Sequence, residues 1–123
     1  MSDPILGWKI DRADRAALLA RFPPLYRETV ADHVTFGRKS SAPPLPDAAR
    51  AVVVGRADDG LGVEALVVEV NGDTARWDGS TYHVTWSLEP GREARESNAV
   101  IAERGWTPVA GRPSVGLAPD QWP

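Results

Sequence analysis

The sequence Val63-Glu64-Ala65-Leu66-Val67-Val68-Glu69-Val70-Asn71-Gly72 indicates a buried strand that ends in a hairpin turn. Val is enriched in strands because its branched side chain packs well on a pleated surface. Asn-Gly beside an apolar run is a strong hairpin signal. Residues 51–56 are a strand candidate before this stretch, and residues 74–77 and 81–88 are candidates after it. Because the connections are short, these four segments are predicted to form an antiparallel sheet.

A helix is predicted before this sheet, over residues 11–21. Asp11 is a suitable N-cap, and Pro23-Pro24 ends the helix because proline lacks a backbone donor. A short strand candidate follows at residues 31–37. A second helix is predicted after the sheet.

The second helix is expected over residues 98–104, with Ser97 as its N-cap and Gly105 at its end. Residues 115–117 add one more strand candidate. Helices packed on an antiparallel sheet define the α+β class. The chain is therefore predicted to be a single α+β domain over residues 1–123.

The composition narrows the possible classes of protein. The chain has 123 residues, a net charge of −3 and no cysteine, so disulfides, thiolate nucleophiles and cysteine metal ligands are all absent. No apolar run approaches the ~20 residues that a membrane span needs. The first residues lack the features of a signal peptide. We expect a cytoplasmic monomer that does not bind membranes, and the slight acidity argues against a broad nucleic-acid surface.

The two histidines of the chain stand in matching motifs, His33-Val34-Thr35-Phe36 and His83-Val84-Thr85-Trp86. With six threonines and thirteen valines in 123 residues, both matches at both histidines would arise by accident in roughly one such chain in forty thousand. A histidine in a strand is more often structural than catalytic. The repetition is what favours a functional role here.

Strand geometry explains why this repeat is useful. Residues i and i+2 lie on one face of a strand, about 6.5 Å apart, and residue i+1 lies on the other. His33 and Thr35 are therefore expected on a polar face, and so are His83 and Thr85. The hydrophobic residue between each pair then faces the core. Two such strands side by side would direct two imidazoles and two hydroxyls at one small anion.

This set of side chains suits phosphoryl chemistry. A neutral imidazole can accept a proton from an attacking water, and a protonated imidazole can give one to the leaving oxygen. An ordinary histidine pKa near 6.5 allows both roles. Threonine hydroxyls can donate to phosphate oxygens. Two histidines without a clustered carboxylate make a poor metal site, so no metal or other cofactor is expected.

The two motifs resemble the signature of the two-histidine (2H) phosphoesterase superfamily, a pair of His-hydrophobic-Ser/Thr-hydrophobic segments. The resemblance implies a two-lobed α+β fold in which each pseudo-symmetric lobe contributes one motif strand to a central groove, with two helices outside. It also implies metal-independent action on cyclic phosphodiesters. His33 and His83 would be the catalytic acid and base, and Thr35 and Thr85 would hold the phosphate.

Segments around the motifs are similar to those of cyclic phosphodiesterase modules in RNA-repair and tRNA-ligase proteins: Phe22-Pro23-Pro24, Glu89-Pro90-Gly91 and Trp106-Thr107-Pro108. The expected substrate is a nucleotide or short RNA 3′ end bearing a 2′,3′-cyclic phosphate. One alternative is a 2′,5′-oligonucleotide or ADP-ribose cyclic phosphodiesterase. Another is a non-catalytic module that binds the phosphate of a nucleotide or RNA end.

Other residues carry weaker expectations. Arg38 and Lys39 follow the first motif and are equally suited to contacting substrate or to being solvated. Ser97-Asn98 is predicted to cap a helix rather than to contact substrate. Trp86 is expected in the core, and the other four tryptophans are assigned to the core or surface rather than to the site.

Overall fold

The structure is a computed structural model that describes residues 3–123. These residues form eight strands and two helices. In chain order they are β1 (Ile5–Ile10), α1 (Arg12–Arg21), β2 (Glu28–Thr29), β3 (His33–Arg38), β4 (Arg50–Asp58), β5 (Val63–Val70), β6 (His83–Leu88), α2 (Glu96–Arg104), β7 (Thr107–Pro108) and β8 (Ser114–Trp122). Every pairing between these strands is antiparallel, which confirms the predicted α+β class.

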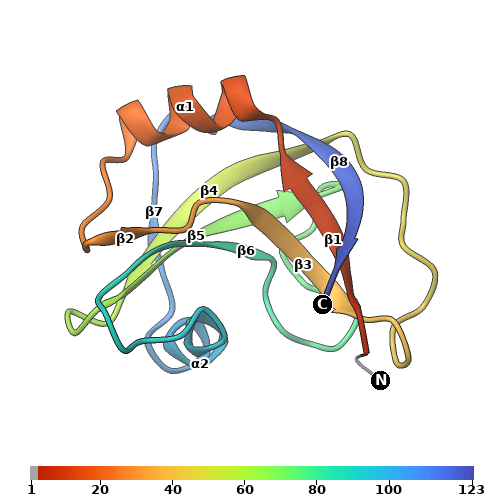
Figure 1. Cartoon of the computed structure of the whole chain (residues 1–123). Coiled ribbons are helices and arrows are strands. Elements are labelled where there is room, and N and C mark those ends of the chain that lie inside the picture. The colour runs from red at the N-terminus through yellow and green to blue at the C-terminus, as the bar shows by residue number, and fades with distance from the viewer. Residues whose placement is uncertain (1–2) are drawn as a thin grey trace.

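The strands form one strongly curved sheet, in the order β2-β6-β5-β4-β8-β1-β3, with β7 paired to β4. β2 and β3 stand at the two ends of this order. They lie close together because β3 follows β2 in the chain after a short connection. The backbone amides of Val30 and Ala31 donate to Trp86 and Thr85 of β6, at 3.0 Å each. As a result β3 lies beside β6, as Figure 1 shows.

The concave side of the sheet holds the main hydrophobic core. Trp8, Phe36 and Trp86 are its largest members, and each is at most 2% exposed. The rings of Trp8 and Phe36 meet edge to face, with centroids 5.7 Å apart, a favourable aromatic geometry. Helix α1 closes one end of this core by burying Leu18. Trp86 faces the core, as predicted.

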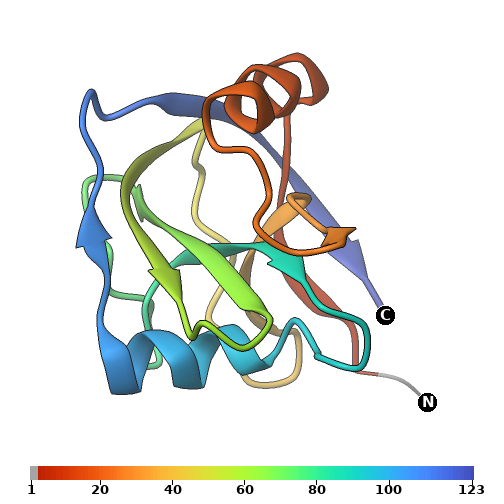
Figure 2. The ribbon, with the colours of Figure 1, turned by 90° about the vertical axis from the view of Figure 1, so that its left-hand side faces the viewer.

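Helix α2 covers the opposite face of the sheet, below it in Figure 2. Val100 and Ile101 of α2 pack against Ala65 and Val67 of β5 in a second, smaller core. β5 is thus buried on both faces, which explains why its sequence is nearly all apolar instead of alternating.

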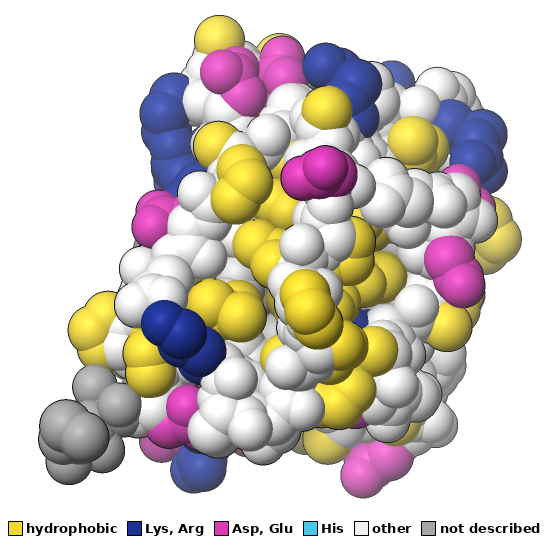
Figure 3. All heavy atoms as spheres, turned by 90° about the vertical axis from the view of Figure 1, so that its right-hand side faces the viewer, with side chains coloured by type: hydrophobic (Ala, Val, Ile, Leu, Met, Phe, Trp, Pro, Cys, Tyr) yellow, Lys and Arg dark blue, Asp and Glu magenta, His cyan; other side chains and the backbone are white. Residues whose placement is uncertain are grey.

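The connection between β3 and β4 runs along the side of the sheet, at the right in Figure 1. Ala42, Leu45 and Ala48 of this connection are partly buried against the main core. Figure 3 shows the molecule from this side, with hydrophobic side chains gathered across the middle of the face and charged groups around them.

Several predicted elements are confirmed. The helix predicted at 11–21 is α1, and the Asp11 side chain caps it by accepting from the Asp14 amide at 3.0 Å. Strand β5 has the predicted bounds. The turn after it places Asn71 and Gly72 at φ +52° and +81°, the left-handed conformations that a two-residue hairpin turn requires.

The strand predicted at 74–77 is wrong. Only Ala75 forms a bridge, with Thr81. The carboxylates of Asp73 and Asp78 accept hydrogen bonds from the backbone amides of Ala75 and Ser80, respectively. These local hydrogen bonds compete with the pairing of a strand. The segment is a loop that folds toward β3.

The N-cap predicted at Ser97 is also wrong. Helix α2 begins at Glu96, and Arg95 precedes it without a side-chain cap. Ser97 lies inside the helix and is completely buried. Its hydroxyl contacts β6 instead of the helix backbone. Gly105 ends the helix as predicted, at φ +70°.

Strand β1 was not predicted, and β8 is longer than the predicted 115–117. β1 lies between β3 and β8. β8 continues through Pro119, which lacks a backbone donor. Proline is tolerated there because this half of β8 pairs with β1 alone, whereas β4 pairs only with residues 114–116.

A buried carboxylate ties several elements together. Glu64 of β5 is 0% exposed and accepts from Arg56 Nε at 2.8 Å, from Ser87 Oγ at 2.6 Å and from the Leu25 amide at 3.0 Å. These donors satisfy a charge that would otherwise strongly destabilise the fold.

Replacing Arg56 with Ala should therefore reduce the free energy of unfolding by about 3–5 kcal/mol, because it leaves a buried charge without its partner. Urea denaturation would measure the loss. Arg112→Ala is the matched control. The Arg112 side chain is exposed and pairs with Glu69, so this variant should lose at most about 1 kcal/mol of unfolding free energy. Equal losses in the two variants would contradict this account.

Candidate functional site

A cavity of about 540 Å³ opens beside β3 and β6, and all four residues of the two His-x-Thr motifs line it. In β3, Val34 and Phe36 are buried in the main core, so His33 and Thr35 lie on the other face of the strand. The same alternation in β6 sends Val84 and Trp86 to the core. The structure thus brings together four side chains from two motifs that are fifty residues apart.

His33 lies between a carboxylate and an indole ring. Its Nδ1 is 3.1 Å from Oδ2 of Asp32, and its ring centroid is 4.5 Å from that of Trp122. Burial lowers the pKa of His33 from its ordinary value of 6.5, and the Asp32 carboxylate offsets part of that effect. Nδ1–H is the donor in this contact, since the carboxylate can only accept.

Asp32 is itself held by two cations. Lys9 Nζ lies 2.5 Å from Oδ2, and Arg12 Nη2 lies 3.0 Å from Oδ1. Burial opposes ionisation of Asp32, but hydrogen bonds from Lys9, His33 and Arg12 outweigh it and lower its pKa to about 2. The carboxylate is therefore ionised throughout the neutral range.

His83 has a different environment. Its Nδ1 donates to the backbone carbonyl of Thr81 at 2.8 Å, and the residue is only 8% exposed. Burial is the main cause that lowers the pKa of His83, and the positive charges of Arg76 and His33 lower it further. This environment favours the neutral imidazole.

The two imidazoles share one property that matters for catalysis. In each of them an acceptor takes the Nδ1 proton, so Nε2 is the nitrogen left for a ligand. A neutral ring offers a lone pair at Nε2, and a protonated ring offers a proton there. The pair can thus accept one proton and donate another in the same cavity.

The two threonines differ. The Thr85 hydroxyl lies 2.9 Å from Oγ of Ser97 and 3.2 Å from the carbonyl oxygen of Ala94, so α2 holds it in place. Among residues 3–123 the Thr35 hydroxyl has no hydrogen-bond partner. It is free to donate to an anion in the cavity.

Arg76 is a cavity residue that sequence reasoning missed. Its side chain is 8% exposed, and its Nη1 donates to the carbonyl oxygen of Thr35 at 3.2 Å. Asp78 binds the other side of the guanidinium, with distances of 3.1 Å from Nε and from Nη2. Arg76 stands in the segment predicted as a strand, and nothing in that pattern marks it as a site residue.

Trp77 and Trp122 also line the cavity, so their assignment to the core or surface alone is corrected. Trp77 donates from Nε1 to the Phe36 carbonyl at 2.7 Å. A Cβ on Gly37 would lie 2.9 Å from the Trp77 ring, and a Cβ on Gly7 would lie 2.8 Å from Trp122. Each indole therefore lies against a strand position that only glycine can fill without displacing the ring.

The structure separates the two basic residues that follow the first motif. Arg38 lines the cavity. Lys39 does not, and its Nζ lies 3.5 Å from Oε1 of Gln121. Asn98, predicted only to cap a helix, also lines the cavity, from the first turn of α2.

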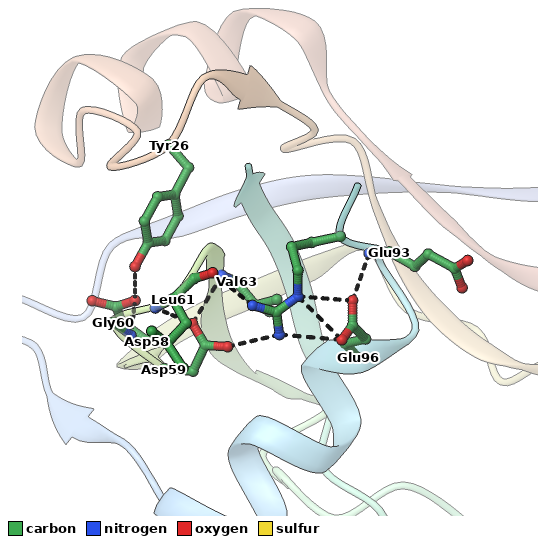
Figure 4. A network of polar contacts seen from close by, with 9 residues as sticks. Tyr26, Asp58, Asp59, Gly60, Leu61, Val63, Glu93 and Glu96 are labelled. Carbon is green, nitrogen blue, oxygen red and sulfur yellow. Dashed lines mark hydrogen bonds and ion pairs between the residues drawn. The ribbon is translucent and has the colours of Figure 1, made fainter. Parts of the chain in front are cut away.

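An ion-pair network fixes the start of α2 at the cavity. Arg92 donates to Asp59 at 2.8 Å, to the Leu61 carbonyl at 2.6 Å and to Glu96 at 3.1 Å, as Figure 4 shows. Arg92 thereby joins the β4–β5 connection to the first turn of α2. This turn carries Ser97, the partner of Thr85.

Comparison of the chain with protein-family models, with curated proteins and with solved structures finds no match. Within residues 3–123 no group of three or more His, Cys, Asp or Glu side chains is arranged to hold a metal ion. None of the helices in this part of the chain is long and apolar enough to cross a membrane.

The lowered histidine pKa values predict how stability depends on pH. Because both imidazoles have a pKa below 6.5 in the folded state, the unfolded chain binds protons more readily as pH falls through that value. The free energy of unfolding should therefore decrease from about pH 7 to about pH 5. Urea denaturation across this range would measure the slope. A double variant, His33→Gln with His83→Gln, should flatten it, and an unchanged slope would contradict the assignment.

Proposed function

We propose that this protein is a metal-independent phosphodiesterase that hydrolyses 2′,3′-cyclic phosphates of nucleotides or short RNA ends. His33 and His83 act as general acid and base, and Thr35 and Thr85 bind the phosphate. The observation that carries the proposal is the convergence of both motifs on one cavity, with Nε2 of each imidazole left for a ligand.

We further propose that the chain is a compact relative of the 2H phosphoesterases. In that family two lobes each contribute one motif strand. Here β3 lies at one end of the strand order, next to β1, and β6 lies near the other end, between β2 and β5. This distribution supports the proposal, because the two motifs belong to different parts of the sheet.

The proposed reaction is an in-line displacement at phosphorus. One neutral imidazole accepts a proton from water, whose oxygen forms a new bond to phosphorus. The bond from phosphorus to a ribose oxygen breaks, and the other, protonated imidazole gives its proton to that oxygen. Thr35 donates to a non-bridging oxygen, while the positive charge of Arg76 stabilises the phosphate.

The size of the cavity supports a small or terminal substrate. A volume of about 540 Å³ lies within the usual range for small-molecule sites, roughly 300–1,000 Å³. The net charge of −3 does not favour long polyanions. We therefore favour mononucleotides and RNA termini over extended RNA.

The purified protein should open a 2′,3′-cyclic nucleotide in the presence of EDTA, with the isomers of the product separated by chromatography. His33→Ala or His83→Ala should each reduce kcat at least ~100-fold, because general acid–base catalysis contributes roughly 10²–10⁴-fold. Arg112→Ala, which changes an exposed ion pair outside the cavity, is the control and should retain full activity.

Three outcomes would contradict parts of this proposal. Normal turnover by either histidine variant would exclude the paired acid–base mechanism. Loss of activity in EDTA that added metal restores would exclude metal independence. If none of the four cyclic nucleotides is hydrolysed, the substrate assignment fails, and a 2′,5′ linkage, an ADP-ribose cyclic phosphate or a binding role must be tested.

The two threonines should respond differently to replacement by Val. Thr35→Val should lower kcat/KM roughly 10-fold, since one hydroxyl to the phosphate is lost, and should leave urea stability unchanged. Thr85→Val should also destabilise the fold by about 1–3 kcal/mol, because it leaves buried Ser97 without its partner. Equal stability losses in both variants would contradict the asymmetry of the two hydroxyls.

A further inference from the structure

The two imidazoles face partners of opposite electrostatic character. The Nδ1 of His33 contacts the ionised carboxylate of Asp32 at 3.1 Å, whereas the Nδ1 of His83 contacts the neutral carbonyl of Thr81 at 2.8 Å. A carboxylate stabilises an imidazolium far more than a carbonyl does, because the contact then joins two opposite charges. The two histidines are therefore inequivalent before any substrate binds.

The surroundings of the His33 ring add to this difference. The Trp122 ring lies beside it, tilted by 52° with centroids 4.5 Å apart, and an indole ring at this distance attracts a cation. The ring is also partly open to solvent, with a side chain that is 24% exposed. Burial still lowers the pKa of His33, but its greater solvent access and the nearby indole make a positive charge less unfavourable there than on His83.

The surroundings of His83 act in the opposite direction. The residue is 8% exposed, so a charge there loses most of its hydration. The positive charges of Arg76, from the loop before β6, and of His33 itself both oppose a positive charge on His83. His83 is therefore the imidazole that stays neutral when His33 is protonated.

Two basic side chains hold the Asp32 carboxylate beside His33. Lys9, which pairs with His33 across β1 and β3, and Arg12 of α1 both bind the carboxylate. They fix its position and keep it ionised. Lys9 also opposes protonation of His33, since it adds a positive charge at the same carboxylate oxygen.

We propose that Asp32 is a positioning residue that makes His33 the imidazole of the pair that carries a proton as the general acid, which makes His83 the general base. The inference rests on the phosphodiesterase function proposed above. The proton of the attacking water passes to Nε2 of His83 as its oxygen bonds to phosphorus. The proton on Nε2 of His33 passes to the ribose oxygen that leaves.

NMR titration provides a direct test, because the chain has only two histidines. Their ring signals are assigned with the His33→Ala variant. Asp32→Asn should shift the titration of His33 to lower pH and shift that of His83 much less, and in the opposite direction, because a neutral His33 no longer repels the proton on His83. Lys9→Gln should shift His33 the opposite way. Asp47→Asn is the charge-matched control, since Asp47 is exposed and lies outside the cavity. An unchanged His33 titration in Asp32→Asn would overturn the proposal.

The pH profile of kcat/KM tests the assigned roles. Activity is lost on the alkaline side as the acid loses its proton, and on the acidic side as the base gains one. In Asp32→Asn the alkaline limb should move to lower pH, much further than the acidic limb moves, and kcat/KM at neutral pH should fall roughly 10- to 100-fold. Asp32→Glu, which keeps the charge, should recover part of the loss. Movement of the acidic limb instead would reverse the roles and overturn the proposal.

The two measurements separate failure of this inference from failure of the proposed function. If the wild-type protein hydrolyses no cyclic phosphodiester, the proposed function fails whatever Asp32 does. The NMR titration still decides, without any substrate, whether Asp32 controls the protonation of His33. If turnover is present but insensitive to Asp32→Asn, only the role of Asp32 is overturned.

Discussion

Two backbone hydrogen bonds, from the amides of Val30 and Ala31 to carbonyl oxygens of β6, hold the first histidine motif beside the second. Ala31 is completely buried and has φ +44°, a left-handed conformation that is unfavourable for a residue with a Cβ. Its carbonyl oxygen accepts from Nε of Arg15 in α1 at 2.6 Å. At this corner the chain stops pairing with β6 and begins to pair with β1. Without it, β3 would not reach the cavity.

Successive side chains of a strand point to opposite faces, and this alternation directs the histidine and threonine of each motif to the same side. The two hydrophobic residues of each motif are buried in the main core, so packing fixes the backbone of the motif. The histidine and threonine then point away from the core with little freedom to move. Helix α2 completes the cavity from that side, because Ser97 binds Thr85 and Arg92 anchors the first turn. Rigid support of this kind is what a proton-transfer geometry requires.

Much of the fold could be predicted from the sequence where local signals are strong. β5 combines an apolar run with an Asn-Gly turn, and α1 combines an Asp cap with a terminating Pro-Pro. Prediction failed where the decisive partner is distant. β1 contains Gly7, a poor strand former, and exists because β3 and β8 pair with it on both sides. Ser97 looks like a helix cap, but its hydroxyl binds Thr85 of β6 instead.

The candidate site divides in the same way. The sequence by itself determined the two histidines and two threonines, and the face of the strand on which each lies, because a period of two depends on neighbouring residues alone. Only the tertiary structure decided that Asp32 contacts His33 while a carbonyl contacts His83, and that Arg76 and Trp122 join them. Asp32 and Thr81 are chain neighbours of the histidines that they contact. Arg76 and Trp122 come from separate elements, and their proximity depends on how the sheet curves. The electrostatic difference between the two imidazoles therefore begins with a chain neighbour of each histidine, and the fold completes it because Lys9 and Arg12 hold Asp32 beside His33.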